Sequence, residues 1–223
     1  MTEYYIKNIC RKHHIHDYTI NDDGSIDVEN VEFNPNYYHI KRIPLKFNKV
    51  NNNFMFICND VRSLKGSPKY VNGHFRCGGN KLKSLKYSPE YVGELFCCES
   101  NNLRTLKYAP KEVNDFNCFG NKLTSFRYSP EHINGNFICS NNNIKNFEYF
   151  PKSVNGYFYC YGNPIYEVWK LFEDTTKIDL LNDCDIFRNE DTNKPGIFID
   201  RLNDFLEIIG KPTVKEVYGY KSL

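Results

Sequence analysis

A repeat of 21 residues runs through the middle of this chain of 223 residues. The segment VNGHFRCGGNKLKSLKYSPEY, which begins at Val71, matches VGELFCCESNNLRTLKYAPKE, which begins at Val92, in its Val, Phe, Cys, Asn, Leu, Tyr and Pro positions. The pattern recurs from Val113, Ile133 and Val154, and a weaker copy begins at Val50. Units of this length bury their apolar face only by stacking on their neighbours, so the repeat predicts a solenoid.

The columns of the repeat have distinct physical meanings. A phenylalanine column precedes a cysteine column by two residues, at Phe75, Phe96, Phe116, Phe137 and Phe158 and at Cys77, Cys98, Cys118, Cys139 and Cys160. Because residues two apart in a strand point to one face, we expect a short strand with both side chains inward. An asparagine column follows at Asn80, Asn101, Asn121, Asn142 and Asn163. These amides are predicted to bond backbone groups where the chain leaves the strand.

The rest of each unit contains turn signals and further apolar columns. Leu82 and Leu85 begin two apolar columns, and a proline recurs once per unit from Pro68 to Pro151. Asn-Gly pairs begin at Asn72, Asn134 and Asn155, and such pairs are typical of tight turns. We therefore expect a tight turn before each Phe-x-Cys strand.

The string F-x-C-x-x-N-x-L resembles the leucine-rich repeat core, L-x-L-x-x-N-x-L, over about residues 29 to 165. One position departs from the family, because Val71 stands four residues before Phe75 where a leucine is expected three before. The resemblance implies an α/β repeat solenoid, a leucine-rich repeat stack of about six to seven coils with parallel β-strands. The repeats, with the segments YTINDDGSIDV and IDRLNDFLEIIGKPTVKEV, are similar to short leucine-rich repeat proteins of tailed bacteriophages, which implies a phage origin.

Both ends of the stack need a cover, since a terminal coil exposes an apolar face. Residues 1–28 are predicted to form an N-terminal cap, with a helix over 3–13 and a β-hairpin over YTINDDGSIDV, before the solenoid of residues 29–165. Residues 166–223 are predicted to form a C-terminal helical cap of short amphipathic helices. Basic and acidic residues give these three parts net charges of −2, +8 and −4, so a basic solenoid lies between acidic caps.

Composition excludes several classes of protein. A single alanine, Ala109, argues against a helical bundle. No stretch has the length of a membrane span and the opening is not that of a signal peptide, so we expect a cytoplasmic protein, in the host cytoplasm for a phage gene. No catalytic motif is present, and we expect neither an enzyme nor a bound cofactor.

The nine cysteines are interpreted mainly as packing groups, since no Cys-x-x-Cys pair occurs. Cys97 is the exception, because its parity points outward, and we expect it to react first with an alkylating reagent. Cys10, His13 and His14 have the spacing of ligands on one helix face, but a solvated helix end is the favoured interpretation and no metal site is predicted.

The expected binding surface is the concave strand face, where outward residues of successive units vary. The candidate partner-binding residues are Tyr157, Tyr159, Tyr161, Phe119, Asn117, Arg76, His74 and Glu99. Tyrosine is frequent at interface hot spots because it buries a large area and keeps a polar group. We therefore expect a protein partner, a host protein for a phage gene, bound without catalysis. The oligomeric state stays open.

An alternative function rests on a basic ridge along the outer segment. The ridge consists of Lys65, Lys86, Lys107 and Arg127 in one column and includes Lys83 and Arg104 from a second. Such a row of charges suits nucleic-acid or nucleotide phosphates, although charge also keeps a repeat array soluble. We expect the aromatic columns on a different face from this ridge, which counts against a single-strand binding groove.

Overall fold

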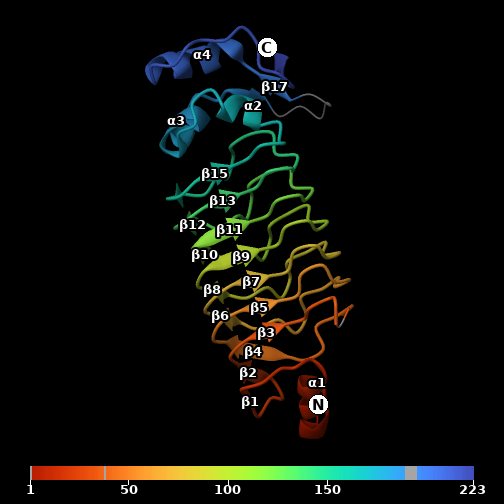
Figure 1. Ribbon diagram of the computed structural model, residues 1–223. Helices are drawn as coiled ribbons and strands as arrows, with labels where there is room; N and C mark the ends of the chain where they lie inside the picture. The colour runs from red at the N-terminus through yellow and green to blue at the C-terminus, as the bar shows by residue number, and fades with distance from the viewer. Residues whose placement is uncertain (1, 38, 189–194) are drawn as a thin grey trace.

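The computed structural model describes residues 2–37, 39–188 and 195–223 of an α/β protein rich in parallel strands. Figure 1 shows an elongated molecule with one helix at the N-terminal end and the remaining helices at the C-terminal end. The helices are α1 (Glu3–Lys12), α2 (Tyr166–Trp169), the 3-10 helix η1 (Thr175–Lys177), α3 (Ile178–Asp183) and α4 (Ile199–Ile208). No helix in the described part of the chain is long and apolar enough to cross a membrane.

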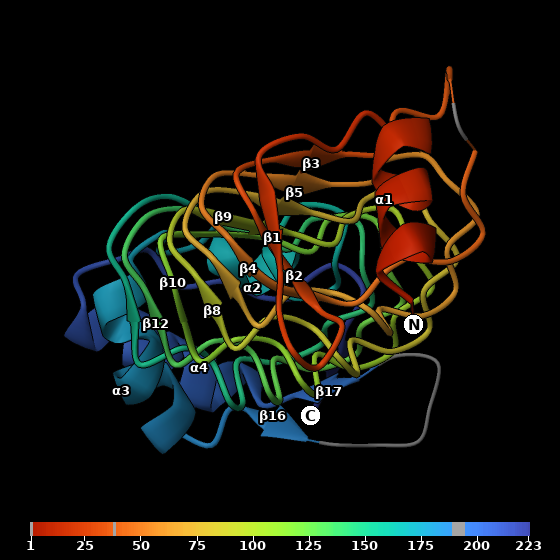
Figure 2. The same cartoon turned by 90° about the horizontal axis from the view of Figure 1, so that it is seen from below.

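Two series of short strands occupy the space between these ends (Figure 2). The first series contains the valine column: β4 (Phe47–Val50), β6 (Tyr70–Val71), β8 (Tyr91–Val92), β10 (Glu112–Val113), β12 (His132–Ile133) and β14 (Ser153–Val154). The second contains the phenylalanine column: β3 (Val31–Glu32), β5 (Phe54–Met55), β7 (Phe75–Arg76), β9 (Leu95–Cys97), β11 (Asp115–Asn117), β13 (Phe137–Ile138) and β15 (Phe158–Tyr159). Each sequence unit therefore contributes two strands, where the sequence predicted one.

The strands pair in the order in which the chain makes them. The second series forms one seven-stranded parallel sheet, β15-β13-β11-β9-β7-β5-β3, in which Phe75 aligns with Phe54 on one side and with Phe96 on the other. The first series is divided between the sheets β1-β2-β4-β6-β8 and β10-β12-β14. This arrangement is compatible with a stack of coils.

The Asn-Gly pairs lie at the bend between the two strands of a unit, and this corrects the expected tight turn. Gly73, Gly135 and Gly156 have no positive φ. They matter because neighbouring units are close: a Cβ on Gly156 would lie 2.5 Å from the backbone carbon of Gly135. The bend also explains why Val71 stands four residues before Phe75, since the two residues belong to separate strands.

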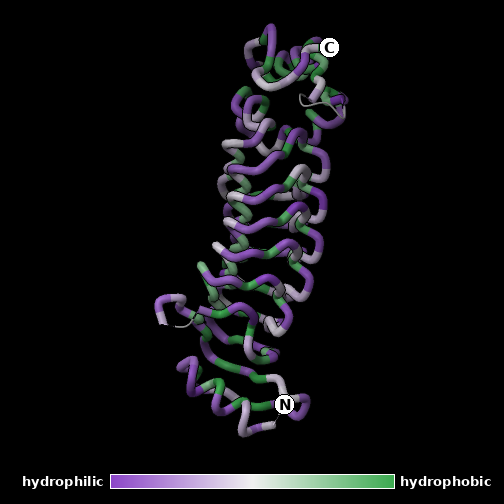
Figure 3. Tube along the Cα trace, turned by 90° about the vertical axis from the view of Figure 1, so that its right-hand side faces the viewer, coloured by the Kyte–Doolittle hydropathy of each residue, from purple (hydrophilic) through white to green (hydrophobic). Residues whose placement is uncertain are grey.

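The core is a continuous aromatic ladder. The rings of Phe75 and Phe96 lie 5.3 Å apart, those of Phe96 and Phe116 lie 5.5 Å apart, and all three side chains are fully buried. In Figure 3 hydrophobic and hydrophilic stretches alternate along each turn of the chain, as inward and outward positions require. The predicted inward Phe and Cys columns are thus buried as expected.

The asparagine column forms a second, polar ladder beside the aromatic one. The side chain of Asn101 accepts a hydrogen bond from the Leu82 amide at 3.0 Å and donates to the carbonyl oxygens of Cys77, Cys98 and Glu99 at 3.0–3.2 Å. Asn80 and Asn121 make equivalent bonds in the units on either side. Each amide therefore ties the backbone of its own unit to that of the unit before it, whereas bonds to the unit after it were expected from the sequence.

The two ends differ from the middle. The predicted helix and hairpin near the N-terminus are α1 and the antiparallel pair β1 (Tyr18–Ile20) and β2 (Ile26–Val28). Near the C-terminus, α2, α3 and α4 lie within the predicted helical segments, but a small sheet of β16 (Phe187–Arg188), β17 (Gly196–Ile197) and β18 (Lys221–Ser222) accompanies them and was not predicted. Tyr220 attaches this part to the repeats, since its hydroxyl donates to the Lys145 carbonyl at 2.6 Å.

The cysteines require one correction. Cys97 points outward on β9, yet it is only 5% exposed, and burial raises the pKa of its thiol to about 11. The charges of Arg76 and Glu99, on the neighbouring unit and on its own, act on this thiol, so long side chains lie close to it. Cys58, which follows the weaker Phe56 copy of the column, is the exposed cysteine.

Brief alkylation of the native protein at neutral pH is expected to modify Cys58 first and Cys184 next. The other seven cysteines are buried, and thiols react only as accessible thiolates. Peptide mass spectrometry after a time course of iodoacetamide treatment measures the order, with a denatured sample as the control in which all nine react. Modification of Cys97 at the same rate as Cys58 would contradict the burial described here.

Candidate aromatic and acidic binding site

Strand alternation on β15 places three tyrosines at the surface. Phe158 and Cys160 point into the core, so the residues between and beside them point outward. Tyr157, Tyr159 and Tyr161 are 71%, 48% and 60% exposed, and the first two rings lie 5.9 Å apart. Together they form the most exposed group of aromatic side chains on the phenylalanine strand series.

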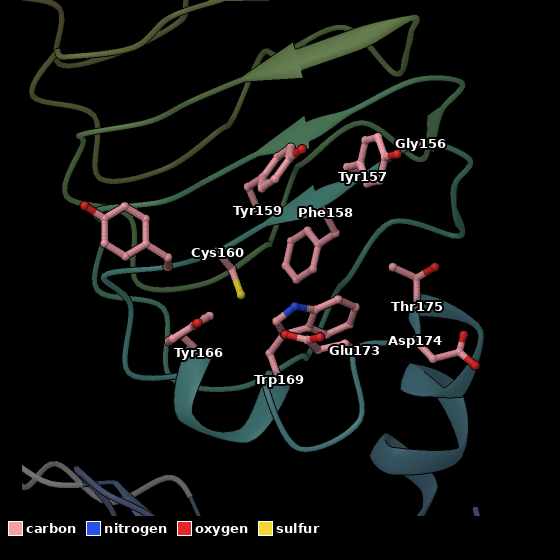
Figure 4. A pocket seen from close by; sticks show the side chains of 11 residues that line it. Gly156, Tyr157, Phe158, Tyr159, Cys160, Tyr166, Trp169, Glu173, Asp174 and Thr175 are labelled. Carbon is pink, nitrogen blue, oxygen red and sulfur yellow. The ribbon is translucent and has the colours of Figure 1, made fainter.

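A pocket of about 510 Å³ lies beside these tyrosines, between β15, α2 and the loop that follows α2. Figure 4 shows the side chains that line it, with the Trp169 ring below Phe158. The centroids of these two rings lie 4.9 Å apart in an edge-to-face arrangement, and Trp169 is 7% exposed. The pocket therefore has a rigid aromatic floor and a tyrosine rim.

Two carboxylates complete the lining. Glu173 and Asp174 come from the loop after α2, and Glu173 adopts a left-handed backbone conformation with φ +49°. Asp174 accepts hydrogen bonds from the Thr176 amide at 2.9 Å and from the Thr176 hydroxyl at 2.6 Å, which hold the pKa of its carboxyl below the ordinary value. Aromatic faces and carboxylates both attract cations, so the pocket suits a positively charged group.

The cysteine at this pocket is not an activated nucleophile. Burial, and after it the charge of Glu173, raises the pKa of the Cys160 thiol well above the ordinary value. Cys160 therefore stays protonated at neutral pH, and a protonated thiol is a poor nucleophile and a poor metal ligand.

The other candidate partner-binding residues lie within two residues of β7, β9 or β11 in the same seven-stranded sheet, outside this pocket. His74, Arg76, Glu99, Asn117 and Phe119 are all partly buried. The His74 ring lies 3.1 Å from the Glu94 carboxylate, and the Asn117 amide donates to the Glu99 carboxylate at 2.8 Å. Glu99 and Asn117 thus bond each other, whereas the three tyrosines remain exposed.

The basic ridge has an aromatic neighbour that the sequence interpretation missed. Tyr87, Tyr108, Tyr128 and Tyr149 form an exposed column next to the ridge residues. The Lys86 ammonium lies 5.2 Å from the centre of the Tyr87 ring, and Lys107 and Arg127 take the same position over Tyr108 and Tyr128. The sequence interpretation considered only the aromatic columns of the strand face and overlooked this one, although a basic residue, Tyr, Ser or Ala, and Pro recur together from Lys86, Lys107 and Arg127. Lys83 and Arg104 are exposed as well.

One histidine at the end of α1 corrects the sequence interpretation. His13 is buried with its ring 5.3 Å from that of Phe33, so it does not lie at a solvated helix end. Among residues 2–37, 39–188 and 195–223, no group of three or more His, Cys, Asp and Glu side chains is placed to hold a metal ion.

Comparison with protein-family models, with curated proteins and with solved structures finds no match for this chain.

Proposed function

We propose that the chain is a leucine-rich repeat solenoid that binds a protein partner without catalysis, through the tyrosine rim and acidic pocket at the C-terminal end of its strand face. The solenoid part rests on the 21-residue repeat, on the order of the parallel strands and on the asparagine ladder. For a phage gene, the partner is a protein of the host cytoplasm.

The observation that carries the binding proposal is the grouping of Tyr157, Tyr159 and Tyr161 around a pocket lined by Glu173 and Asp174. A tyrosine immobilises few rotatable bonds when it is buried by a partner, so three together supply much apolar area at low entropic cost. The carboxylates of Glu173 and Asp174 add a preference for a positively charged partner group. The partner surface that fits is an apolar patch with a lysine or arginine that enters the pocket.

Catalysis has less support at this site. The pocket contains carboxylates and a protonated thiol, with no pairing of a nucleophile and a base within its lining. The pocket lies at the junction of β15, α2 and the loop that follows α2.

The test is affinity capture from host lysate on immobilised wild type and on the triple variant Tyr157→Ala/Tyr159→Ala/Tyr161→Ala. A matched control is Tyr87→Ala/Tyr108→Ala/Tyr128→Ala, which removes three tyrosines of comparable exposure from another part of the molecule. The captured protein, once purified, should bind the first variant about tenfold or more weakly and the control variant like wild type. Equal affinities for all three would remove the aromatic end from the proposal.

A further inference from the structure

The surface that contains Tyr87, Tyr108, Tyr128 and Tyr149 with Lys86, Lys107 and Arg127 is called the tyrosine–cation ladder here. Each of the four tyrosines is between 48% and 61% exposed, and each comes from the same position of a successive repeat unit. Arg127 lies over two rings, at 5.0 Å from the centre of Tyr128 and 5.6 Å from that of Tyr149, so it connects two units of the ladder.

The cations of the ladder are available to an anionic ligand. Within the described residues, neither Lys86 nor Lys107 nor Arg127 forms an ion pair with a carboxylate, and Lys65 extends the row by one unit. The column ends at Glu148, where the sign of the charge changes. With Lys65, the row thus presents four consecutive positive charges, three of them beside exposed aromatic rings.

The backbone of the ladder gives a second argument. Tyr87, Tyr108, Tyr128 and Tyr149 have φ between +62° and +77°, in the left-handed region that favours glycine. Gly66 occupies the same position one unit earlier, with φ +102°, so glycine fits this turn. The tyrosines are too exposed to be required by the core, and strained conformations of this kind cluster at functional sites.

The N-terminal end of the ladder opens into a cleft of about 810 Å³. Tyr87 and Gly66 lie on its wall together with Lys65, Lys69 and Arg42. Glu90 also lines this cleft, and it is the acidic side chain there. Positive charge and apolar surface therefore continue beyond Tyr87 into the preceding unit.

We propose that the tyrosine–cation ladder binds a short single-stranded nucleic acid. Phosphates would lie against the ammonium and guanidinium groups, and bases would stack on the open faces of the tyrosine rings. Adjacent units are about 4.8 Å apart, so four units span about 14 Å. At a rise of about 3.4 Å per nucleotide, that length spans about four steps, or about five nucleotides. An acidic polypeptide would use the charges alone and would leave the ring faces without a partner.

Fluorescence anisotropy with a labelled eight-nucleotide oligothymidylate tests the proposal in a salt series. With four phosphates neutralised, the logarithm of the association constant is expected to fall against the logarithm of salt concentration with a slope of about −3. Tyr87→Gly/Tyr108→Gly/Tyr128→Gly is expected to weaken binding about tenfold or more at each salt concentration and to leave the slope unchanged. Glycine suits the left-handed turn, so this variant should fold, and the corresponding Tyr→Phe variant should bind like wild type.

The charge and specificity controls complete the design. Lys86→Gln/Lys107→Gln/Arg127→Gln should reduce the slope by about 2, and Tyr157→Ala/Tyr159→Ala/Tyr161→Ala should bind the oligonucleotide like wild type. Absence of salt-sensitive binding at low salt overturns the proposal. So does binding that the Tyr→Gly variant retains and that polyglutamate displaces as well as unlabelled oligonucleotide, since that result assigns the ladder to acidic polypeptides. The protein-binding proposal rests on other residues and stands or falls separately.

Discussion

Replacement of Phe96 by alanine is expected to lower the free energy of unfolding by about 3–5 kcal/mol. Phe96 is fully buried in the middle of the aromatic ladder, with the rings of Phe75 and Phe116 at 5.3 Å and 5.5 Å. Both neighbours are held by their own strands, so they cannot move to fill the space. The loss therefore combines the transfer of the ring from the core with the cost of a cavity.

Urea denaturation followed by circular dichroism measures this loss. The matched control is Tyr91→Ala, which removes an aromatic side chain that directly precedes this unit and is 50% exposed, and its effect should stay within about 0.5 kcal/mol. A loss below about 1 kcal/mol for Phe96→Ala would show that the phenylalanine column does not form the core.

The second large effect concerns the polar ladder. Asn101→Ala is expected to cost about 2–3 kcal/mol, because it leaves the buried Leu82 amide without its acceptor and removes one donor from the carbonyls of Cys77 and Cys98. The adjacent Asn102 is partly exposed, and Asn102→Ala is the control of identical chemistry. Equal stability of the two variants would contradict the role given to the asparagine column.

The sequence predicted the core of the fold because the same few residues determine it in every unit. Phe96, Cys98 and Asn101 recur at constant spacing, and strand parity alone fixes their inward direction. The two-strand character of each unit was missed, since strands of two residues such as Tyr70–Val71 contain no alternation to detect. The small C-terminal sheet was missed for a related reason: Gly196–Ile197 pairs with Lys221–Ser222, and neither segment has a pattern that identifies its partner.

The candidate site was predicted in part. The outward tyrosines of β15 followed from parity, but the pocket did not, because Glu173 and Asp174 reach it through a loop whose path the sequence does not reveal. Strand parity also did not predict how exposed an outward-pointing side chain is. Cys97 points outward and is nevertheless buried, since units this close together allow long side chains to cover a small one.

The pocket can be tested with a probe of known chemistry, because its floor contains Trp169, the sole tryptophan of the chain. Titration with a short arginine-containing peptide should give a saturable change in tryptophan fluorescence, and a peptide with citrulline in place of arginine should not. Glu173→Gln/Asp174→Asn should weaken the response to the arginine peptide, while the asparagine keeps an acceptor for the Thr176 amide.

The most direct measurement of the central claim is this titration on wild type and on Tyr157→Ala/Tyr159→Ala/Tyr161→Ala, with Tyr87→Ala/Tyr108→Ala/Tyr128→Ala as the control. The proposed function predicts saturable binding of the arginine peptide to wild type and control, and an affinity about tenfold or more lower for the first variant. A Trp169 signal that does not respond to the peptide, or that responds equally in all three proteins, would contradict it.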